Sequence, residues 1–261
     1  MTLDEGGWRR PAVRVISPPA EVSGIVELFW IDEWSEAETS GRQFRIVADD
    51  APHVLWHVSR ESGQGVERLT LVGSRAWHHD VDLSGRHLLI GARLRPGALP
   101  LLTHLPAMRF TNRSVQLTEL VDRSGSSAIR QMSLAREDAT VDQLASIIAL
   151  LASRGSSVDE RAGWIGALAG DTRTSVAELE RALGMRARTL RAWSVANFGM
   201  GMKRFLRIRR LHVALEMWLS GAHDSWTRIA AAAGYADQPH LIRDCRALLG
   251  QSPAAFVARA G

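Results

Sequence analysis

The segments VAELERALGM (176–185) and WTRIAAAAGY (226–235) are two copies of one pattern near the end of this 261-residue chain. They align at an offset of 50, which pairs Gly184 with Gly234. Each copy places apolar residues three and four positions apart, as an amphipathic helix does. The glycine that follows can end a helix in the left-handed conformation. The pattern therefore predicts a short helix that stops at a glycine, twice.

A second helix is expected after each copy. With one inserted residue the offset becomes 51, which pairs Leu190 with Leu241 and Gly199 with Gly250. A helix, a glycine turn and a second helix form the pattern of a helix-turn-helix unit. Single units of this kind occur in many helical folds, so the tandem arrangement is the informative feature. A helical repeat that docks on another protein is the alternative interpretation.

Charge separates the two parts of the chain. Residues 171–261 carry 14 basic and 7 acidic residues, a net charge of +7, whereas residues 1–170 carry 18 and 21, a net charge of −3. A basic last third favours a polyanionic partner, although an arginine-rich solvated surface would give the same count. Double-stranded DNA accounts for both the tandem units and the arginines, and a protein-binding repeat accounts only for the first.

The segment KRFLRIRRLHVALEMWLSG (203–221) joins the two units. Its apolar residues recur at spacings of three and four from Phe205 to Trp218, which predicts one continuous helix. About sixteen residues give a helix of roughly 24 Å, a spacer that could set two recognition helices into successive major grooves about 34 Å apart. Phosphate contact and a solvated role are both open for the basic residues of its first turns. These are Lys203, Arg204, Arg207, Arg209 and Arg210.

The first hundred residues follow a different pattern. Short apolar runs alternate with turn-forming clusters, and strands at intervals of about ten residues predict an antiparallel sandwich or barrel. The runs are VSGIVELFW (22–30), FRIVA (44–48), HVLWHVS (53–59), RLTLVG (68–73) and HLLIGARL (87–94). We expect an α+β fold with three parts: a β-rich domain over 1–122, a helical linker region over 123–157, and an all-α domain with two helix-turn-helix units over 158–261.

The segments GMRARTLRAWSVANFGMGMKRFLRIRRL (184–211) and GYADQPHLIRDCRALLGQSPAAF (234–256) resemble the two helix-turn-helix units of AraC-type (AraC/XylS family) transcription regulators. The resemblance implies seven helices, with one long helix between the units. In the front half, IVELFW (25–30) and LLIGARLRPGAL (88–99) look like the cupin-like β domain that precedes this module in one branch of the family. The resemblance implies that this domain senses a small ligand or mediates dimerisation.

The resemblance also assigns candidate residues that read bases. They are Arg186, Arg188 and Arg191 in the first unit and Gln238, His240 and Arg243 in the second. The arginine fork can hold O6 and N7 of guanine, and glutamine can pair with N6 and N7 of adenine. Arg207 of the joining helix is the candidate phosphate contact, so its loss should weaken binding to all sequences alike.

A metal-dependent cupin-type enzyme with a helical accessory domain is the alternative function. The segment WHHDVDLSGRH (77–87) holds His78, His79 and His87 beside two aspartates, and clustered histidine with carboxylate is a common metal-ligand set. However, adjacent residues on a strand point to opposite faces, and no complete cupin metal motif is present. The sequence also lacks the GxxxxGK[ST] and GxSxG motifs. We therefore expect no catalytic residues, no metal and no cofactor.

Composition excludes several classes of protein. The longest nearly apolar run, 144–152, is nine residues long and too short to span a bilayer, and no signal peptide is evident. Cys245 is the single cysteine, which excludes an internal disulfide framework. The protein is expected in the cytoplasm. Its expected partners are double-stranded DNA, a small-molecule effector, a second copy of the chain in a homodimer and, for an activator, RNA polymerase.

Overall fold

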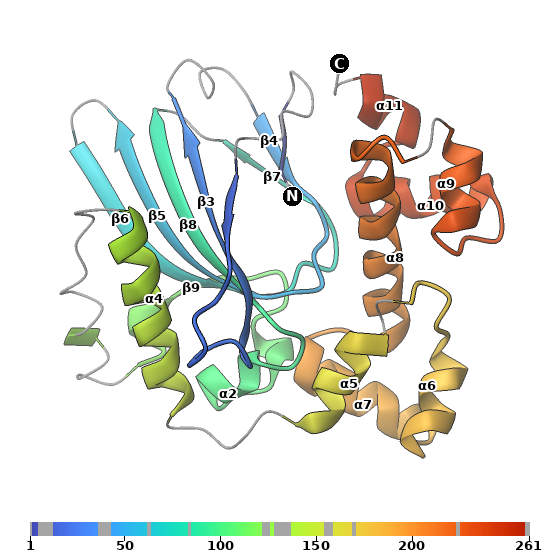
Figure 1. The fold of residues 1–261 in the computed structure, drawn as a ribbon, viewed down its shortest axis with the longest axis horizontal. Helices are drawn as coiled ribbons and strands as arrows, with labels where there is room; N and C mark the ends of the chain where they lie inside the picture. Colours follow the sequence, from blue (N-terminus) through green and yellow to red (C-terminus); the bar gives the residue numbers. More distant parts are fainter. Residues whose placement is uncertain are drawn as a thin grey trace.

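The structure is a computed structural model in which a β-rich part precedes a helical part, so the α+β expectation is confirmed. Figure 1 shows the sheets on the left and the helices α5 to α11 on the right, with α8 running between them. The structure describes residues 2–4, 13–35, 43–61, 64–82, 85–121, 126–127, 137–153, 159–168, 171–222 and 225–258.

The strands form two antiparallel sheets. In the larger sheet the strand order is β2-β3-β8-β5-β6-β9, and in the smaller sheet it is β1-β4-β7. The larger sheet consists of β2 (Arg14–Ile16), β3 (Val26–Trp34), β8 (Arg86–Leu94), β5 (His53–Glu61), β6 (Gln64–Val72) and β9 (Ser114–Gln116). The smaller sheet consists of β1 (Thr2–Asp4), β4 (Gln43–Ile46) and β7 (His79–Asp82). Each of the five predicted apolar runs overlaps one of these strands.

Helices cover one face of the larger sheet (Figure 1). Along β5 the side chains of Val54 and Trp56 are buried in the core that α4 (Glu137–Ala152) closes with Leu144 and Ile148. The short helix α2 (Leu99–Thr103) and the 3-10 turns η1 (Ala107–Arg109) and η2 (Leu117–Glu119) complete this core. Helix α4 lies within 123–157, the segment expected to link the two domains, and it packs as part of the β-rich domain.

The helical part contains the two expected units. The first pairs α6 (Val176–Leu183) with α7 (Ala187–Phe198), and the second pairs α9 (Trp226–Ala232) with α10 (Gln238–Leu249). The helix α5 (Glu160–Leu168) precedes them, and α11 (Pro253–Ala258) follows. The four paired glycines all adopt positive φ angles, of 62° at Gly184, 77° at Gly199, 79° at Gly234 and 77° at Gly250. The predicted glycine-terminated helix pairs are confirmed.

Side-chain caps fix where these helices begin. Ser175 and Glu178 form a reciprocal capping box at the start of α6, and the Ser225 hydroxyl accepts a hydrogen bond from the backbone of α9. The carboxylate of Asp237 accepts from the His240 backbone N–H at the start of α10. Each cap satisfies a backbone donor that has no partner within the helix. The two copies of the repeat therefore begin in the same way.

The helix α8 (Met202–Leu219) joins the units. Its 18 residues make it about 27 Å long, and its buried residues Phe205, Ile208, Leu211 and Leu215 follow the predicted apolar stripe. Side chains from both units pack on this stripe in one continuous core. Among the described residues, no helix has the length and apolar character needed to cross a membrane.

Candidate nucleic-acid interface

The start of α7 carries three exposed arginines. Arg186 occupies the N-cap position, and Arg188 and Arg191 follow on the helix. The opposite side of α7 is buried through Leu190 and Phe198, which hold the helix in the core of the unit. The three predicted base-reading residues of the first unit are therefore together at one helix end, and their guanidinium groups are open to solvent.

The start of α10 presents its candidates less uniformly. Arg243 is exposed, whereas Gln238 and His240 are half-buried. The Gln238 side-chain oxygen accepts a hydrogen bond of 2.8 Å from the Thr227 hydroxyl on α9. The His240 ring lies edge-on to Tyr235, with 5.1 Å between ring centroids. Arg243 is thus the most open of the three predicted residues in this unit.

Arg207 bonds to a carboxylate inside the protein. Its Nη2 and Nε atoms lie 2.6 Å and 3.0 Å from Oδ1 of Asp244 on α10. The Asp244 side chain is 3% exposed and that of Arg207 is 31% exposed. The guanidinium that was expected at a DNA phosphate therefore ties the joining helix α8 to the second recognition helix.

Three other arginines of α8 also bond within the chain. Arg204 donates to the Ala76 carbonyl oxygen, Arg210 donates to the Thr172 carbonyl oxygen, and Arg209 pairs with Asp50. Lys203 is exposed. The basic start of α8 is therefore largely occupied by contacts within the protein, and among the predicted DNA-binding residues the open arginines lie on α7 and α10.

The second unit has a buried polar centre beneath its recognition helix. Burial raises the pKa of the Cys245 thiol to about 12, and the neighbouring Asp244 carboxylate adds to the rise. Burial and the same carboxylate also raise the pKa of Tyr235. Cys245 is fully buried in the core. A thiol that stays protonated and buried acts as a small core residue.

His87 pairs with a histidine outside the segment 77–87, in which the sequence grouped it with His78 and His79. His57 on β5 and His87 on β8 lie 2.8 Å apart between Nε2 and Nδ1, while His79 is the first residue of β7 and His78 precedes it. Burial, and to a smaller extent His87 and Arg68, lowers the pKa of His57 to about 4. In the described part of the chain, the group with three close potential metal ligands is Asp49, Asp50 and His212; it is considered further below.

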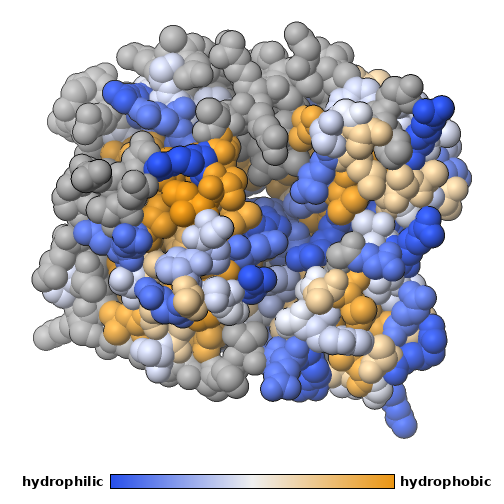
Figure 2. Space-filling view, viewed as in Figure 1, coloured by the Kyte–Doolittle hydropathy of each residue, from blue (hydrophilic) through white to orange (hydrophobic). Residues whose placement is uncertain are grey.

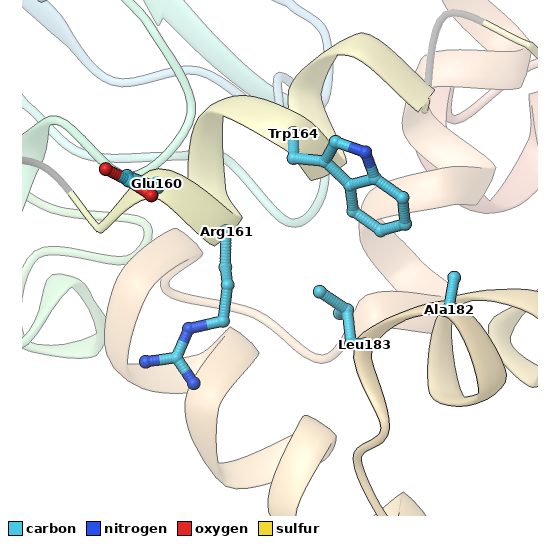
Figure 3. A pocket seen from close by; sticks show the side chains of 5 residues that line it. All are labelled: Glu160, Arg161, Trp164, Ala182 and Leu183. Atoms are coloured by element: carbon cyan, nitrogen blue, oxygen red, sulfur yellow. The ribbon is translucent and has the colours of Figure 1, made fainter.

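The tryptophans of the β-rich domain do not share one environment. Trp34 and Trp56 are buried, and the Trp30 indole donates to His53, whereas Trp77 is 52% exposed. A depression of about 340 Å³ lies instead over α5 and α6. There the Trp164 ring stands across from Ala182 and Leu183 (Figure 3).

Comparison with known families agrees with this architecture. Residues 179–259 match the family described as a helix-turn-helix domain, a range that includes nearly all of both units and the helix α8 between them. The chain contains an AraC-type helix-turn-helix domain, which a separate N-terminal domain precedes. This domain is that of a DNA-binding transcription regulator.

The front half of the chain matches a second family. Residues 14–116 match a domain of unknown function, DUF6597. No curated protein sequence matches the chain.

Solved structures of ToxT from Vibrio cholerae are similar to this regulator at low sequence identity. The apo K231A variant from strain SCE256 is 10% identical with a TM-score of 0.46, covering 89% of this chain and 98% of ToxT. ToxT from strain O395 is 8% identical with a TM-score of 0.44, covering 99% and 97%.

Proposed function

We propose that this regulator binds operator DNA by placing α7 and α10 in two major grooves on one face of the duplex. The observation that carries the proposal is the tandem pair of helix-turn-helix units on one rigid helix, with exposed arginines on each recognition helix. A helix of about 27 Å between the units suits grooves that recur about 34 Å along the axis. Phosphate contacts would supply affinity that falls with salt.

The proposed base contacts differ between the two units. Arg186, Arg188 and Arg191 give the first unit three open guanidinium groups, which favours guanine-rich sequence. In the second unit Arg243 is the open reader. Gln238 and His240 would reach bases only after the contacts with Thr227 and Tyr235 adjust. We expect Arg243→Ala to relax specificity at one base pair by about 1–3 kcal/mol.

The β-rich domain would convey the regulatory input. We propose that it responds to a small-molecule effector or supports a homodimer, and that the regulator acts in the cytoplasm, with RNA polymerase as a further partner where it activates. Packing of the domain against α8 gives such an input a physical route to the DNA-binding units. Sedimentation of the purified chain with and without duplex tests the homodimer.

We assign no reaction to the chain. The candidate metal group of Asp49, Asp50 and His212 has both carboxylates already bonded to arginines, since Arg93 binds Asp49 and Arg209 binds Asp50. A cation would have to displace these guanidinium groups. If the purified protein contained stoichiometric metal and lost it on changing Asp50 or His212, that result would support the alternative of a metal-dependent enzyme.

The experiment that tests the proposal is selection of fragments from a random duplex pool by the purified full chain across a salt series. We expect a motif with two conserved blocks about one helical turn apart, and an affinity that falls steeply as salt rises. Binding with no motif would reduce the function to non-specific DNA binding. No binding at low salt would overturn the proposal and favour the protein-binding repeat.

A further inference from the structure

A buried group of charges connects the β-rich domain to α8. The Asp50 side chain is 1% exposed, and its Oδ2 atom accepts a hydrogen bond of 2.7 Å from Nε of Arg209. Nη2 of Arg93 on β8 lies 3.2 Å from the other oxygen of Asp50, and Arg93 also bonds both oxygens of Asp49 at 2.8 Å. Figure 2 shows hydrophilic side chains gathered between the two parts of the molecule.

Asp50 is the only carboxylate in this group that reaches an arginine on each side. Arg93 belongs to the sheet and Arg209 to α8, so a single buried carboxylate joins the two parts of the molecule. Arg209 also donates to the Gly166 carbonyl oxygen at 3.2 Å, and its guanidinium lies 5.2 Å from the Phe205 ring centroid. Arg209 therefore links Asp50 to α5 as well as to its own helix.

The β-rich domain contacts the residues just before α8, the middle of α8 and the end of α10. Where α7 meets α8, the Ser74 hydroxyl donates to the Phe198 carbonyl oxygen at 3.0 Å, and the Thr111 hydroxyl donates to that of Gly199 at 2.6 Å. Further along α8, the His212 ring lies 2.8 Å from the Ala48 carbonyl oxygen. The backbone N–H of Ala48 in turn donates to the carbonyl oxygen of Leu248 on α10. One domain thus touches the end of each recognition helix.

We propose that Asp50 is a positioning residue for DNA recognition, which acts through Arg209 to hold α8 on the β-rich domain and so fixes the separation of α7 and α10. The DNA part of this inference rests on the proposed function. A clamp that holds the middle of α8 on the β-rich domain, together with the contacts at Phe198, Gly199 and Leu248, narrows the range of separations that the two recognition helices sample. Narrower sampling favours one block spacing in the operator and disfavours others.

Removing the carboxylate charge should release this clamp. In Asp50→Asn the Arg209 guanidinium loses its anion, and Arg93 keeps Asp49 and Glu27. Arg209→Gln removes the same pair from the other side. Asp50→Glu keeps a carboxylate, so it should retain the wild-type behaviour at least in part. Glu33→Gln is the matched control, because it breaks the exposed Glu33–Arg86 ion pair away from the interface.

The first measurement needs no DNA. Cysteines for spin labels are placed at Ala192 on α7 and Ala247 on α10, both exposed, while buried Cys245 stays unlabelled. The full chain should give one narrow label-to-label distance, as should Glu33→Gln. Asp50→Asn and Arg209→Gln should give a broadened or shifted distribution. If both variants keep the wild-type distribution, Asp50 positions nothing.

The second measurement uses the selected operator and versions with one or two base pairs inserted between its blocks. We expect the wild-type preference for the selected spacing to fall about fivefold or more in Asp50→Asn and Arg209→Gln, with binding to a single block unchanged. An unchanged preference in variants whose label distances have broadened would overturn the link to DNA recognition. If wild type selects no motif, the proposed function fails, and the distance measurement still decides the clamp.

Unfolding could obscure these results, so a milder variant is included. Ser74→Ala removes one hydrogen bond where α7 meets α8 and leaves the charges intact. If Asp50→Asn does not fold, Ser74→Ala should still broaden the label distance, by less than Arg209→Gln. A distance unchanged in both folded variants contradicts the proposal.

Discussion

Arg207 is the residue for which sequence and structure assign the most different roles. Its guanidinium faces Asp244, whose side chain is 3% exposed, so Arg207→Gln leaves a buried carboxylate without its cation. Breaking such a pair from one side costs about 3 kcal/mol. We expect Arg207→Gln to lower the free energy of unfolding by about this amount, measured by urea denaturation.

The salt dependence of DNA binding separates the two roles of Arg207. A phosphate contact would make the slope of affinity against salt smaller by about one in Arg207→Gln. An internal pair leaves that slope unchanged, although affinity falls because α10 is less well held. Asp244→Asn combined with Arg207→Gln should cost little more than either change alone, since both remove the same interaction. Additive losses would contradict the pairing.

His57 gives the β-rich domain a dependence on pH. Its folded pKa of about 4, lowered first by burial and then by His87, lies below the unfolded value of about 6.5. The unfolded chain therefore takes up the proton first, and the free energy of unfolding falls as pH drops from about 6.5 to 4. Because the ring is partly exposed, we expect a loss of about 2 kcal/mol. Urea denaturation at pH 7, 5.5 and 4.5 measures it, and His57→Gln should flatten the curve.

At the scale of elements, the two glycine turns of the first unit differ in what surrounds them. Gly184 and Gly199 have φ angles of 62° and 77°, but an added Cβ meets open space at Gly184 and the Thr111 hydroxyl at Gly199. The left-handed backbone alone costs a residue with a Cβ about 1 kcal/mol. We expect Gly184→Ala to lose about that much stability and Gly199→Ala at least twice as much. Equal losses in thermal denaturation would show that the contact with the β-rich domain contributes nothing.

The elements that the sequence predicted best are those whose signal lies within the element. Glycine-terminated helices and the apolar stripe of α8 have short-range patterns, so the tandem units follow from residues 176–256 alone. The strands β7 (His79–Asp82) and β9 (Ser114–Gln116) are only four and three residues long. Their pairing comes from neighbouring strands, so no local pattern predicted their bounds or partners. The core role of α4 also depends on a sheet that lies distant in sequence.

The candidate site also divides into residues whose environment follows from the local sequence and residues whose partners are distant in sequence. Exposure of Arg188 and Arg191 could be expected, because the buried Leu190 and Phe198 define the inner side of α7. The internal partners of Arg207 and Arg209 could not, since Asp244 is 37 residues away and Asp50 is 159 residues away. A count of basic residues gives the net charge of the last third, and only the tertiary structure shows which of those charges remain free for DNA.

For the molecule as a whole, the contacts between the two parts predict that they unfold together. Val47 and Ala48 of the β-rich domain belong to the core of the helical part, and buried Ser74 bonds to Phe198. Thr111→Val removes the donor to the Gly199 carbonyl oxygen at their boundary, a loss worth about 1–2 kcal/mol. Hydrogen exchange across a denaturant series should therefore show β5 and α10 unfolding at one midpoint that Thr111→Val lowers equally in both. Ser146→Ala, which removes a hydrogen bond within α4 on its exposed side, should leave both unchanged. Separate midpoints in wild type would mean that the two parts open independently, and β-domain input would then need another route to α7 and α10.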